Sequence, residues 1–304
     1  MKKYLNLSLK ILVSGILLGY IFVTNDFSKI SELISKAQIN YLLISILFIL
    51  INYIFSSIRW YYLLIEKRPP ILYMIKLYFV GSFFNNFLPT SIGGDAYKIF
   101  KLGEKLESKT DAFTATFLER FLGMFALVII SLYGYLTFSG VNIWSFIFVF
   151  LLGSGSFILF MIFYPKFQYK PTNLLKFFNI LDKIHASFLR YKKHFNLIFY
   201  SLLSSFVVQF ASVFTQYYIF KALNVELPLN FAFFAFPLIF LSGYAIPSIN
   251  SLGSQEVLYT TFFNSLLIPN PVILSCSFAY HIVRLLVSLL GAYFYINDRE
   301  YVKK

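Results

Sequence analysis

The sequence holds few of the residues that build disulfide frameworks, metal centres or charged catalytic surfaces. Its 304 residues include one cysteine, Cys276, and three histidines, at positions 185, 194 and 281. One thiol cannot form a disulfide framework or a thiolate metal cluster, and these histidines form no HExxH motif. We therefore expect the chain to hold neither a metal ion nor another cofactor.

Charged residues are also scarce, whereas apolar residues are in excess. Only 13% of the residues are charged, 59% are hydrophobic and 21% are aromatic. The mean hydropathy is +0.72. Ordinary soluble domains are about 45–50% apolar and about a quarter charged. Because so few polar residues cannot cover so much apolar surface in water, the composition argues against a soluble enzyme or nucleic-acid-binding protein and predicts a polytopic membrane protein.

Acidic residues are half as common as basic ones, 13 against 26, which gives a formal net charge of +13. In a membrane protein this excess has a simple cause, because cytoplasmic loops collect lysine and arginine. The basic residues gather at the start of the chain, at Lys67 and Arg68, between 166 and 193, and at the end of the chain. We therefore expect both termini in the cytoplasm, a location in the cell (inner, cytoplasmic) membrane, and no nucleic-acid partner.

Long apolar runs mark the expected membrane spans, because a helix needs about 20 apolar residues to cross the hydrocarbon. Six runs are predicted to be full spans of an all-α protein: 5–23, 41–64, 121–138, 143–164, 197–221 and 272–296. The first follows Met1-Lys2-Lys3 as in a signal peptide, but no small-residue cleavage site comes after it. We therefore interpret it as a retained span of a single integral membrane domain, 1–304.

Two further apolar segments do not fit the alternation of full spans. The segments at about 71–110 and 231–268 must each begin and end on one side of the membrane, yet each contains a turn rich in proline, glycine and serine. Non-helical backbone at membrane depth requires protein or a watery cavity around it. We predict two re-entrant helical hairpins, entered from opposite faces like an inverted repeat. Surface loops between full spans are the alternative.

Each turn leads into a helix whose free N–H groups attract anions such as phosphate. The first turn runs from Pro89 to Asp95 and the second from Pro247 to Glu256. The two acids either cap these helices or bind a cationic head group, a proton or a cation, because an acid inside a membrane needs a partner or a purpose. Lys98 lies three residues after Asp95, a neighbouring position on a helix, and is expected to pair with it.

Other polar side chains interrupt the apolar segments near these turns. Asn85 and Asn86 are expected to tie down the broken backbone of the first turn, since buried amides must be hydrogen-bonded. Glu119 and Arg120 either mark the membrane boundary or pair with other segments, because adjacent helix residues do not face each other.

Basic residues also occur within the predicted spans. Arg59 is expected to extend to the cytoplasmic head groups. Arg284 lies deeper in the last span and needs an acidic partner, which Glu256 or Asp95 can supply. We interpret His281 as a satisfied packing residue and not as a ligand.

The region at about 166–196 differs from the spans because lysines lie between its apolar residues. The apolar residues recur at helical spacing: Leu174, Leu175, Phe178, Leu181, Ile184 and Phe188. This pattern predicts a basic amphipathic helix that lies on the anionic cytoplasmic leaflet.

Three motifs follow one another over about residues 40–295. Asn86 to Lys98 has the form N-x-x-P-x-x-x-G-G-D-x-x-K, Glu119 to Gly123 the form E-R-x-x-G, and the turn that ends at Glu256 the form P…G-x-x-E. This series resembles the lysylphosphatidylglycerol synthase transmembrane (flippase-like) family. The sequence departs from the family pattern where Lys98 replaces an arginine, Asn250-Ser251 replaces glycines, and Gln255 replaces a basic residue.

The resemblance implies a flippase-like transporter that moves a phospholipid or a polyprenyl-phosphate-type lipid between leaflets. The head group would pass between the two turns while the acyl chains stay in the bilayer. The residues expected at this path are Asn86, Pro89, Gly93, Gly94, Asp95, Lys98, Glu119, Arg120, Pro247, Gly253, Glu256 and Arg284.

Enzymatic activity is not expected, because the aminoacyl-lipid synthase domain of some relatives does not follow the last span. One alternative is an intramembrane lipid-modifying enzyme that uses Asp95 or Glu256 as a general base. Another is a membrane subunit for a separate lipid synthase or glycosyltransferase. The expected partners are membrane lipids, whether anionic or aminoacylated phospholipids or polyprenyl-phosphate lipids. A second copy of the chain and a lipid-synthesis enzyme are further candidates.

Overall fold

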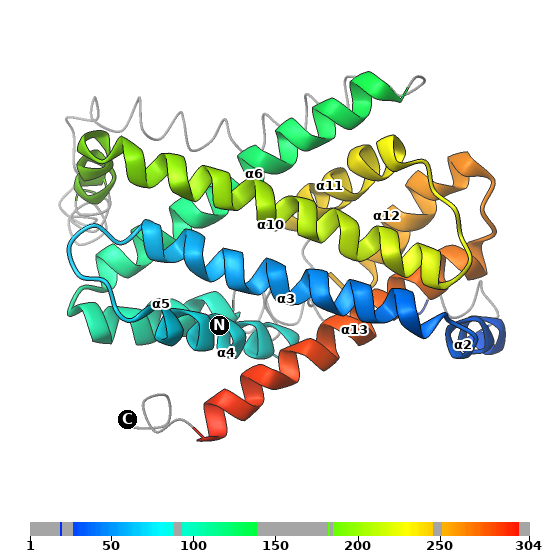
Figure 1. Cartoon of the computed structure of the whole chain (residues 1–304), viewed down its shortest axis with the longest axis horizontal. Coiled ribbons are helices and arrows are strands. Elements are labelled where there is room, and N and C mark those ends of the chain that lie inside the picture. Colours follow the sequence, from blue (N-terminus) through cyan, green and yellow to red (C-terminus); the bar gives the residue numbers. More distant parts are fainter. Residues whose placement is uncertain are drawn as a thin grey trace.

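The computed structural model describes residues 27–87, 93–138, 185–245 and 251–297, together with Gly19 and Asp182. Every regular element within these ranges is a helix (Figure 1). The predicted all-helical class is thereby confirmed for the described residues. Several predictions fall outside them: the span 5–23 apart from Gly19, the span 143–164, the turn residues 88–92 and 246–250, and most of the region 166–184.

The first half of the bundle runs from α2 to α6. Its helices are α2 (Phe27–Ser35), α3 (Ile39–Tyr62), α4 (Ile71–Phe87), α5 (Gly93–Leu106) and α6 (Lys109–Thr137). Pro69 and Pro70 separate α3 from α4, because proline cannot continue a helix but fits just before or within its first turn. Ser108 caps α6 by accepting a hydrogen bond from the Asp111 N–H at 3.3 Å, and the Asp111 carboxylate suits the positive end of the helix.

The second half of the bundle runs to α13. Its elements are the short 3-10 helix η4 (Tyr191–Lys193), α10 (Phe195–Ala222), α11 (Leu229–Ala245), α12 (Ser254–Phe263), the 3-10 helix η5 (Asn264–Leu266) and α13 (Asn270–Asn297). Among the described residues, α3, α6, α10 and α13 are long and apolar enough to cross a membrane. These helices contain nearly all of the predicted spans 41–64, 121–138, 197–221 and 272–296.

Helix α6 begins well before the predicted start of its span at 121. The sequence pattern marked only the apolar run, but the cap at Ser108 starts the helix earlier and the helix continues through a polar stretch. In this stretch the Thr114 and Thr116 hydroxyls each donate a hydrogen bond to the backbone carbonyl one turn back. Glu119 and Arg120 therefore lie in the middle of a helix, and their side chains contact other segments.

The two halves repeat one pattern of helix lengths. In the first half, α3 to α6 have 24, 17, 14 and 29 residues. In the second half, α10 to α13 have 28, 17, 10 and 28 residues. The leading helices α3 and α10 lie side by side and antiparallel, since Gln38 bonds Ala222 whereas Arg59 bonds Ser201 (Figure 1). The halves thus start in opposite directions.

Each half packs its 17-residue helix against the last helix of the other half. Helix α4 lies against α13, and α11 lies against α6. Glycines permit both approaches. A Cβ atom at Gly291 of α13 would overlap the Phe79 carbonyl of α4, and one at Gly134 of α6 would overlap the backbone of Phe234 in α11. Small residues at crossings bring membrane helices into close contact, so these reciprocal contacts hold the two halves together.

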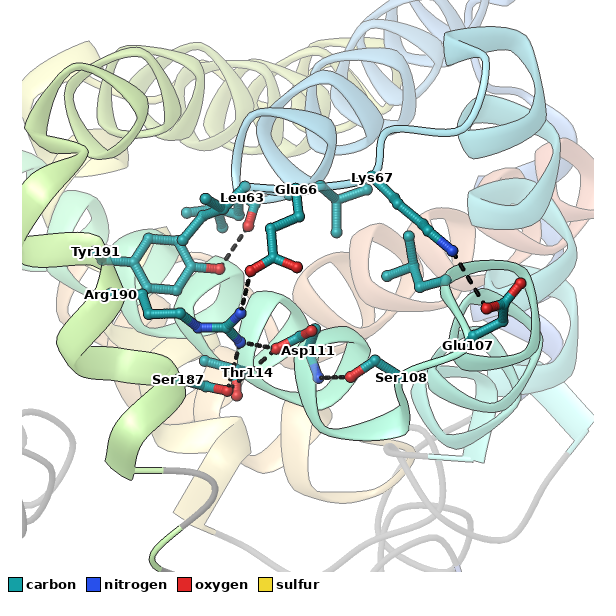
Figure 2. Close-up of a pocket in the computed structure, with 13 residues that line it drawn as sticks. Leu63, Glu66, Lys67, Glu107, Ser108, Asp111, Thr114, Ser187, Arg190 and Tyr191 are labelled. Atoms are coloured by element: carbon teal, nitrogen blue, oxygen red, sulfur yellow. Dashed lines mark hydrogen bonds and ion pairs between the residues drawn. The ribbon is translucent and has the colours of Figure 1, made fainter.

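The described end of the basic region, residues 185–193, packs against the bundle. Phe188 and Tyr191 are buried in one apolar cluster with Trp60. The Tyr191 hydroxyl donates a hydrogen bond to the Leu63 carbonyl (Figure 2), and burial raises the pKa of Tyr191. Of the apolar residues of the predicted membrane-surface helix, Phe188 lies within the described residues, and it is buried against the protein itself. The membrane-surface position of the region stays a prediction.

Arg190 fastens this segment to the ends of two helices. Its guanidinium donates to Glu66, just after α3, at 2.8 Å, and to Asp111 in the first turn of α6 (Figure 2). Burial disfavours the cation, but Asp111 and Glu66 outweigh this effect and raise the pKa of Arg190. These residues border a pocket of about 290 Å³, whose rim also holds the ion pair between Lys67 and Glu107 at 3.3 Å. Since its charges pair with one another, we interpret the pocket as part of a structural clasp.

Replacing Gly291 with alanine is expected to destabilise the bundle. The added methyl group would overlap the Phe79 backbone, and overpacking of this kind costs about 1–3 kcal/mol. The midpoint of SDS-induced unfolding of the purified protein should therefore fall. Leu290→Ala, at a neighbouring side chain that is 42% exposed, is the matched control. An unchanged midpoint for Gly291→Ala would contradict the close crossing of α4 and α13.

Replacing Arg190 with glutamine is expected to loosen the clasp without unfolding the bundle. Because the Arg190 side chain is 37% exposed, water screens its ion pairs, and we expect about two- to fivefold faster hydrogen exchange at the backbone amides of 187–193. Lys192→Gln removes the same charge from an exposed neighbouring side chain and serves as the control. Equal exchange in both variants would show that Arg190 does not hold this segment.

Candidate functional site

The first turn is held by an amide from the preceding helix. Asn85 of α4 accepts a hydrogen bond through Oδ1 from the Gly94 N–H at 2.8 Å, which satisfies one of the free donors at the start of α5. A Cβ atom at Gly94 would overlap the Gly81 carbonyl, so only glycine allows α4 and α5 to approach this closely. The prediction that an amide hydrogen-bonds the backbone of the first turn is confirmed for Asn85. Asn86 donates to the Ser288 hydroxyl of α13 at 2.6 Å, and its role at the turn stays a prediction.

Five side chains of alternating charge form a ladder behind this turn. Arg59 bonds Glu119 at 2.7 Å, Lys98 lies 3.7 Å from Glu119 and 3.0 Å from Asp95, and Arg120 bonds the other Asp95 oxygen. The first four side chains are at most 6% exposed, whereas Arg120 is 32% exposed. The ladder thus runs from α3 through α6 and α5 and ends at a partly open guanidinium.

Aromatic side chains complete the environment of the ladder. The Lys98 ammonium lies 3.9 Å from the centre of the Tyr78 ring and 5.0 Å from that of Trp60. The Tyr78 hydroxyl donates to Glu119 at 3.1 Å. Desolvated charges are costly unless paired and hydrogen-bonded, and cation–π contacts add attraction where water is excluded. With three bases and two acids, the ladder carries a net charge of +1.

The ladder corrects two interpretations of the sequence. Arg59 was expected to extend to the head groups, but it is 5% exposed and pairs with Glu119 and Ser205. Glu119 and Arg120 are not a boundary pair, because both contact other helices: Glu119 contacts α3 and α5, and Arg120 contacts α5. The predicted pairing of Lys98 with Asp95 is confirmed at 3.0 Å. Only the arrangement of helices brings Arg59 and Glu119 together, since 60 residues separate them in the sequence.

The second turn is held by its own acid. Glu256 Oε2 accepts a hydrogen bond from the Gly253 N–H at 2.7 Å, so the predicted capping role of Glu256 is confirmed. Gly253 has a φ of 82°, a conformation that favours glycine. The other Glu256 oxygen accepts from the Ser277 hydroxyl at 2.9 Å and lies 2.9 Å from His281 Nε2. Glu256 is fully buried, and three polar groups satisfy it.

His281 connects this buried acid to Arg284. The Arg284 guanidinium lies 3.2 Å from His281 Nδ1, on the opposite side of the ring from Glu256. The predicted link between Arg284 and Glu256 is therefore indirect. His281 is a partly buried, hydrogen-bonded side chain, as expected, and in addition it positions the arginine of α13.

A polar cavity lies between the two turns. Three adjoining pockets, of about 290, 170 and 50 Å³, all border Arg284, and the two larger ones also share Tyr78, Asn85 and Arg120. We call them together the central cavity. The main polar side chains that line it are Asn52, Ser56, Arg59, Asn85, Asn86, Asp95, Lys98, Arg120, Gln209, Ser212, Gln255 and Arg284.

The structure places the predicted site residues in three groups. Asn86, Asp95, Lys98, Arg120 and Arg284 line the central cavity. Gly93, Gly94, Glu119, Gly253 and Glu256 lie behind it, in the turns or in the ion pairs that support them. Pro89 and Pro247 lie outside the described residues.

Sequence reasoning missed the polar stripe where α3 meets α10. Asn52, Ser56 and Arg59 lie at helical spacing on α3, and Gln209 and Ser212 follow the same spacing on α10. Polar residues that recur every three or four positions in an apolar helix mark one face. This periodicity was the available signal, because buried polar faces of membrane helices point to a protein interior or a cavity.

These features define a polytopic helical membrane protein in which the described ends of two polar turns border a basic cavity. The profile of the family described as lysylphosphatidylglycerol synthase TM region matches residues 7–291. The chain therefore belongs to this family, and the resemblance seen in the three motifs is confirmed.

A relative of similar length supports this assignment. The chain is similar to UPF0104 membrane protein PH1989 of Pyrococcus horikoshii, with 22% identity over an alignment that covers 99% of this chain and 98% of the relative. No solved structure matches the chain significantly.

Replacing Glu119 alone with glutamine is expected to destabilise the protein strongly. Arg59 and Lys98 would lose a buried carboxylate, and breaking a buried ion pair from one side costs about 3–5 kcal/mol. The double variant Arg59→Met/Glu119→Met removes one charge of each sign and should lose much less stability than Glu119→Gln. Thermal unfolding in detergent compares the two. A double variant as unstable as Glu119→Gln would contradict the pairing described for the ladder.

Proposed function

We propose that the protein is a flippase-like transporter that moves a phospholipid or a polyprenyl-phosphate-type lipid between leaflets. The observation that carries this proposal is the central cavity, which Arg120 and Arg284 line from α6 and α13. The first turns of α5 and α12 border the same space through Asp95 and Gln255. A phosphate at this place would meet two guanidinium groups near two helix N-termini, all of which attract anions.

The proposed path moves only the head group through protein. Its phosphate passes Arg120 and Arg284, while the acyl chains remain in the surrounding lipid. In this proposal the pairs α4–α5 and α11–α12 are re-entrant hairpins, both termini are cytoplasmic, and the location is the cell membrane. The opposite directions of α3 and α10 support two hairpins that enter from opposite faces.

The two acids support transport more than catalysis. A general base needs a free carboxylate within reach of the substrate. Asp95 is engaged by Lys98 and Arg120, and Glu256 is engaged by its own helix cap, Ser277 and His281. We therefore propose no enzymatic activity for this chain. A second copy or a separate lipid-synthesis enzyme remains the proposed protein partner.

Replacing Arg284 with glutamine is expected to abolish most of the transport. The change removes the cation that borders all three parts of the central cavity, and loss of a charge-assisted hydrogen bond of about 1.5–3 kcal/mol should slow exchange at least about tenfold. Exchange of fluorescent phospholipids is measured in proteoliposomes with a membrane-impermeant quencher. Arg68→Gln makes the same substitution at an exposed residue outside the cavity and should exchange lipid like the wild type.

Two results would overturn the proposal. Wild-type protein that exchanges no anionic, zwitterionic or polyprenyl-phosphate lipid faster than protein-free liposomes would exclude transport. Exchange that is equal in Arg284→Gln and Arg68→Gln would place the path elsewhere.

A further inference from the structure

Two chemically different sets of side chains line the central cavity. One set is cationic and consists of Arg59, Arg120 and Arg284. The other set is polar and uncharged, and it comes from α3, α10 and α12: Asn52, Ser56, Gln209, Ser212 and Gln255. A phosphate needs only the first set. The second set offers hydroxyl and amide groups to a neighbouring, uncharged part of the same ligand.

The uncharged set is held in fixed positions. Asn52 donates to the Ser212 hydroxyl at 2.7 Å and to the Val208 carbonyl at 3.1 Å, and Ser212 donates to the same carbonyl at 3.0 Å. Gln209 donates to the Gly123 carbonyl at 3.2 Å. These bonds join α3, α10 and α6, so the groups are ordered in advance of any ligand, which lowers the entropic cost of binding.

Gln255 belongs to the same set. Its side chain borders the cavity, and the residue is only 4% exposed. The Tyr259 hydroxyl lies within hydrogen-bonding reach of its side-chain amide, and this hydroxyl itself donates to Gln216. Gln255 is thereby held in place like the other members of the set, beside the space that a ligand hydroxyl would occupy.

Among the described residues, the lining of the central cavity offers no unpaired acid to a cationic head group. Among the described residues that line it, Asp95 is the acid, and Lys98 and Arg120 both pair with it. The turn sequences 88–92 and 246–250 contain neither aspartate nor glutamate. An ammonium group in this space would lie near several cations without a counter-charge, which is unfavourable in a low dielectric.

We infer that the head group is an anionic phosphodiester that carries hydroxyl groups, as glycerol or a sugar-like polyol does, and that aminoacylated lipids are excluded. The phosphate binds the cationic set and the hydroxyls bind Gln255, Ser212 and Asn52. This inference rests on the proposed transport function and narrows its substrate class.

The test compares head groups that differ in one property at a time. The full chain is reconstituted in liposomes with acyl-labelled phosphatidylglycerol, phosphatidylinositol, phosphatidylmethanol or lysyl-phosphatidylglycerol, and leaflet exchange is followed with an impermeant quencher. Phosphatidylmethanol keeps the charged diester but has no hydroxyl. Each hydrogen bond to a head-group hydroxyl should change the affinity for that lipid about fivefold. We therefore expect one or both hydroxyl-bearing lipids to exchange at least about tenfold faster than phosphatidylmethanol. Lysyl-phosphatidylglycerol should exchange at the protein-free rate.

Two variants connect this selectivity to the uncharged set. Gln255→Leu and Ser212→Ala should each lower the preference for hydroxyl-bearing lipid over phosphatidylmethanol by about fivefold. Ser204→Ala is the matched control, because Ser204 and Ser212 each bond a carbonyl one turn back on α10 but only Ser212 lines the cavity. Its preference should equal that of the wild type.

The outcomes separate this inference from the function on which it rests. No exchange of any lipid would overturn the transport function itself. Exchange of phosphatidylmethanol at the rate of both hydroxyl-bearing lipids, or lysyl-phosphatidylglycerol exchange as fast as phosphatidylglycerol exchange, would leave transport standing and overturn the inference. A preference retained in both Gln255→Leu and Ser212→Ala would also overturn it.

Discussion

The structure depends on one constraint, which is that charges buried among apolar helices must be paired. Arg59, Glu119, Lys98, Asp95 and Arg120 satisfy it as a ladder of alternating sign across three helices. The ion pairs of Glu119 with Arg59 and Lys98, and of Asp95 with Arg120, fix the position of one helix relative to another, because breaking them would leave a charge in a low dielectric. The ladder therefore sets the place of α5, whose first turn borders the central cavity. The odd fifth member, Arg120, leaves a net positive charge at the cavity.

The two turns are capped by different residues, although each leads into a helix whose first turn borders the central cavity. The first is capped from outside, by Asn85 of the preceding helix, and its acid is used in ion pairs. The second is capped from inside, by Glu256, which also orders His281 and through it Arg284. Both arrangements bring an arginine to the cavity and leave no nearby acid unpaired, because Asp95 pairs with Lys98 and Arg120 and Glu256 bonds Gly253, Ser277 and His281. This division of roles, acids for support and arginines for the ligand, is the physical basis of the proposed transport of an anionic head group.

Much of the fold could be predicted from the sequence, because hydropathy and helix signals act locally. The apolar runs predicted four of the long helices, and the Pro-Gly turns marked the ends of α4 and α11. The partner of each buried charge could not be predicted in the same way. Lys98 and Asp95 are near neighbours, so their pairing was accessible, whereas Arg59 meets Glu119 only after α3, α5 and α6 assemble. The early start of α6 was missed since the apolar run begins twelve residues after the helix does. The polar stripe of α3 and α10 was visible as periodicity, but its role required the cavity.

The most direct test of the account is whether the central cavity is accessible to water-soluble anions. The native Cys276 is fully buried, so an engineered thiol can be measured against a low background. Ser212→Cys and Ser204→Cys are treated in liposomes with a small anionic thiosulfonate, and labelling rates are compared. The account predicts fast labelling of Ser212→Cys, slowed by a soluble glycerophosphate diester, and slow labelling of Ser204→Cys. Equal rates at the two positions, with no protection, would contradict an open polar cavity between the turns.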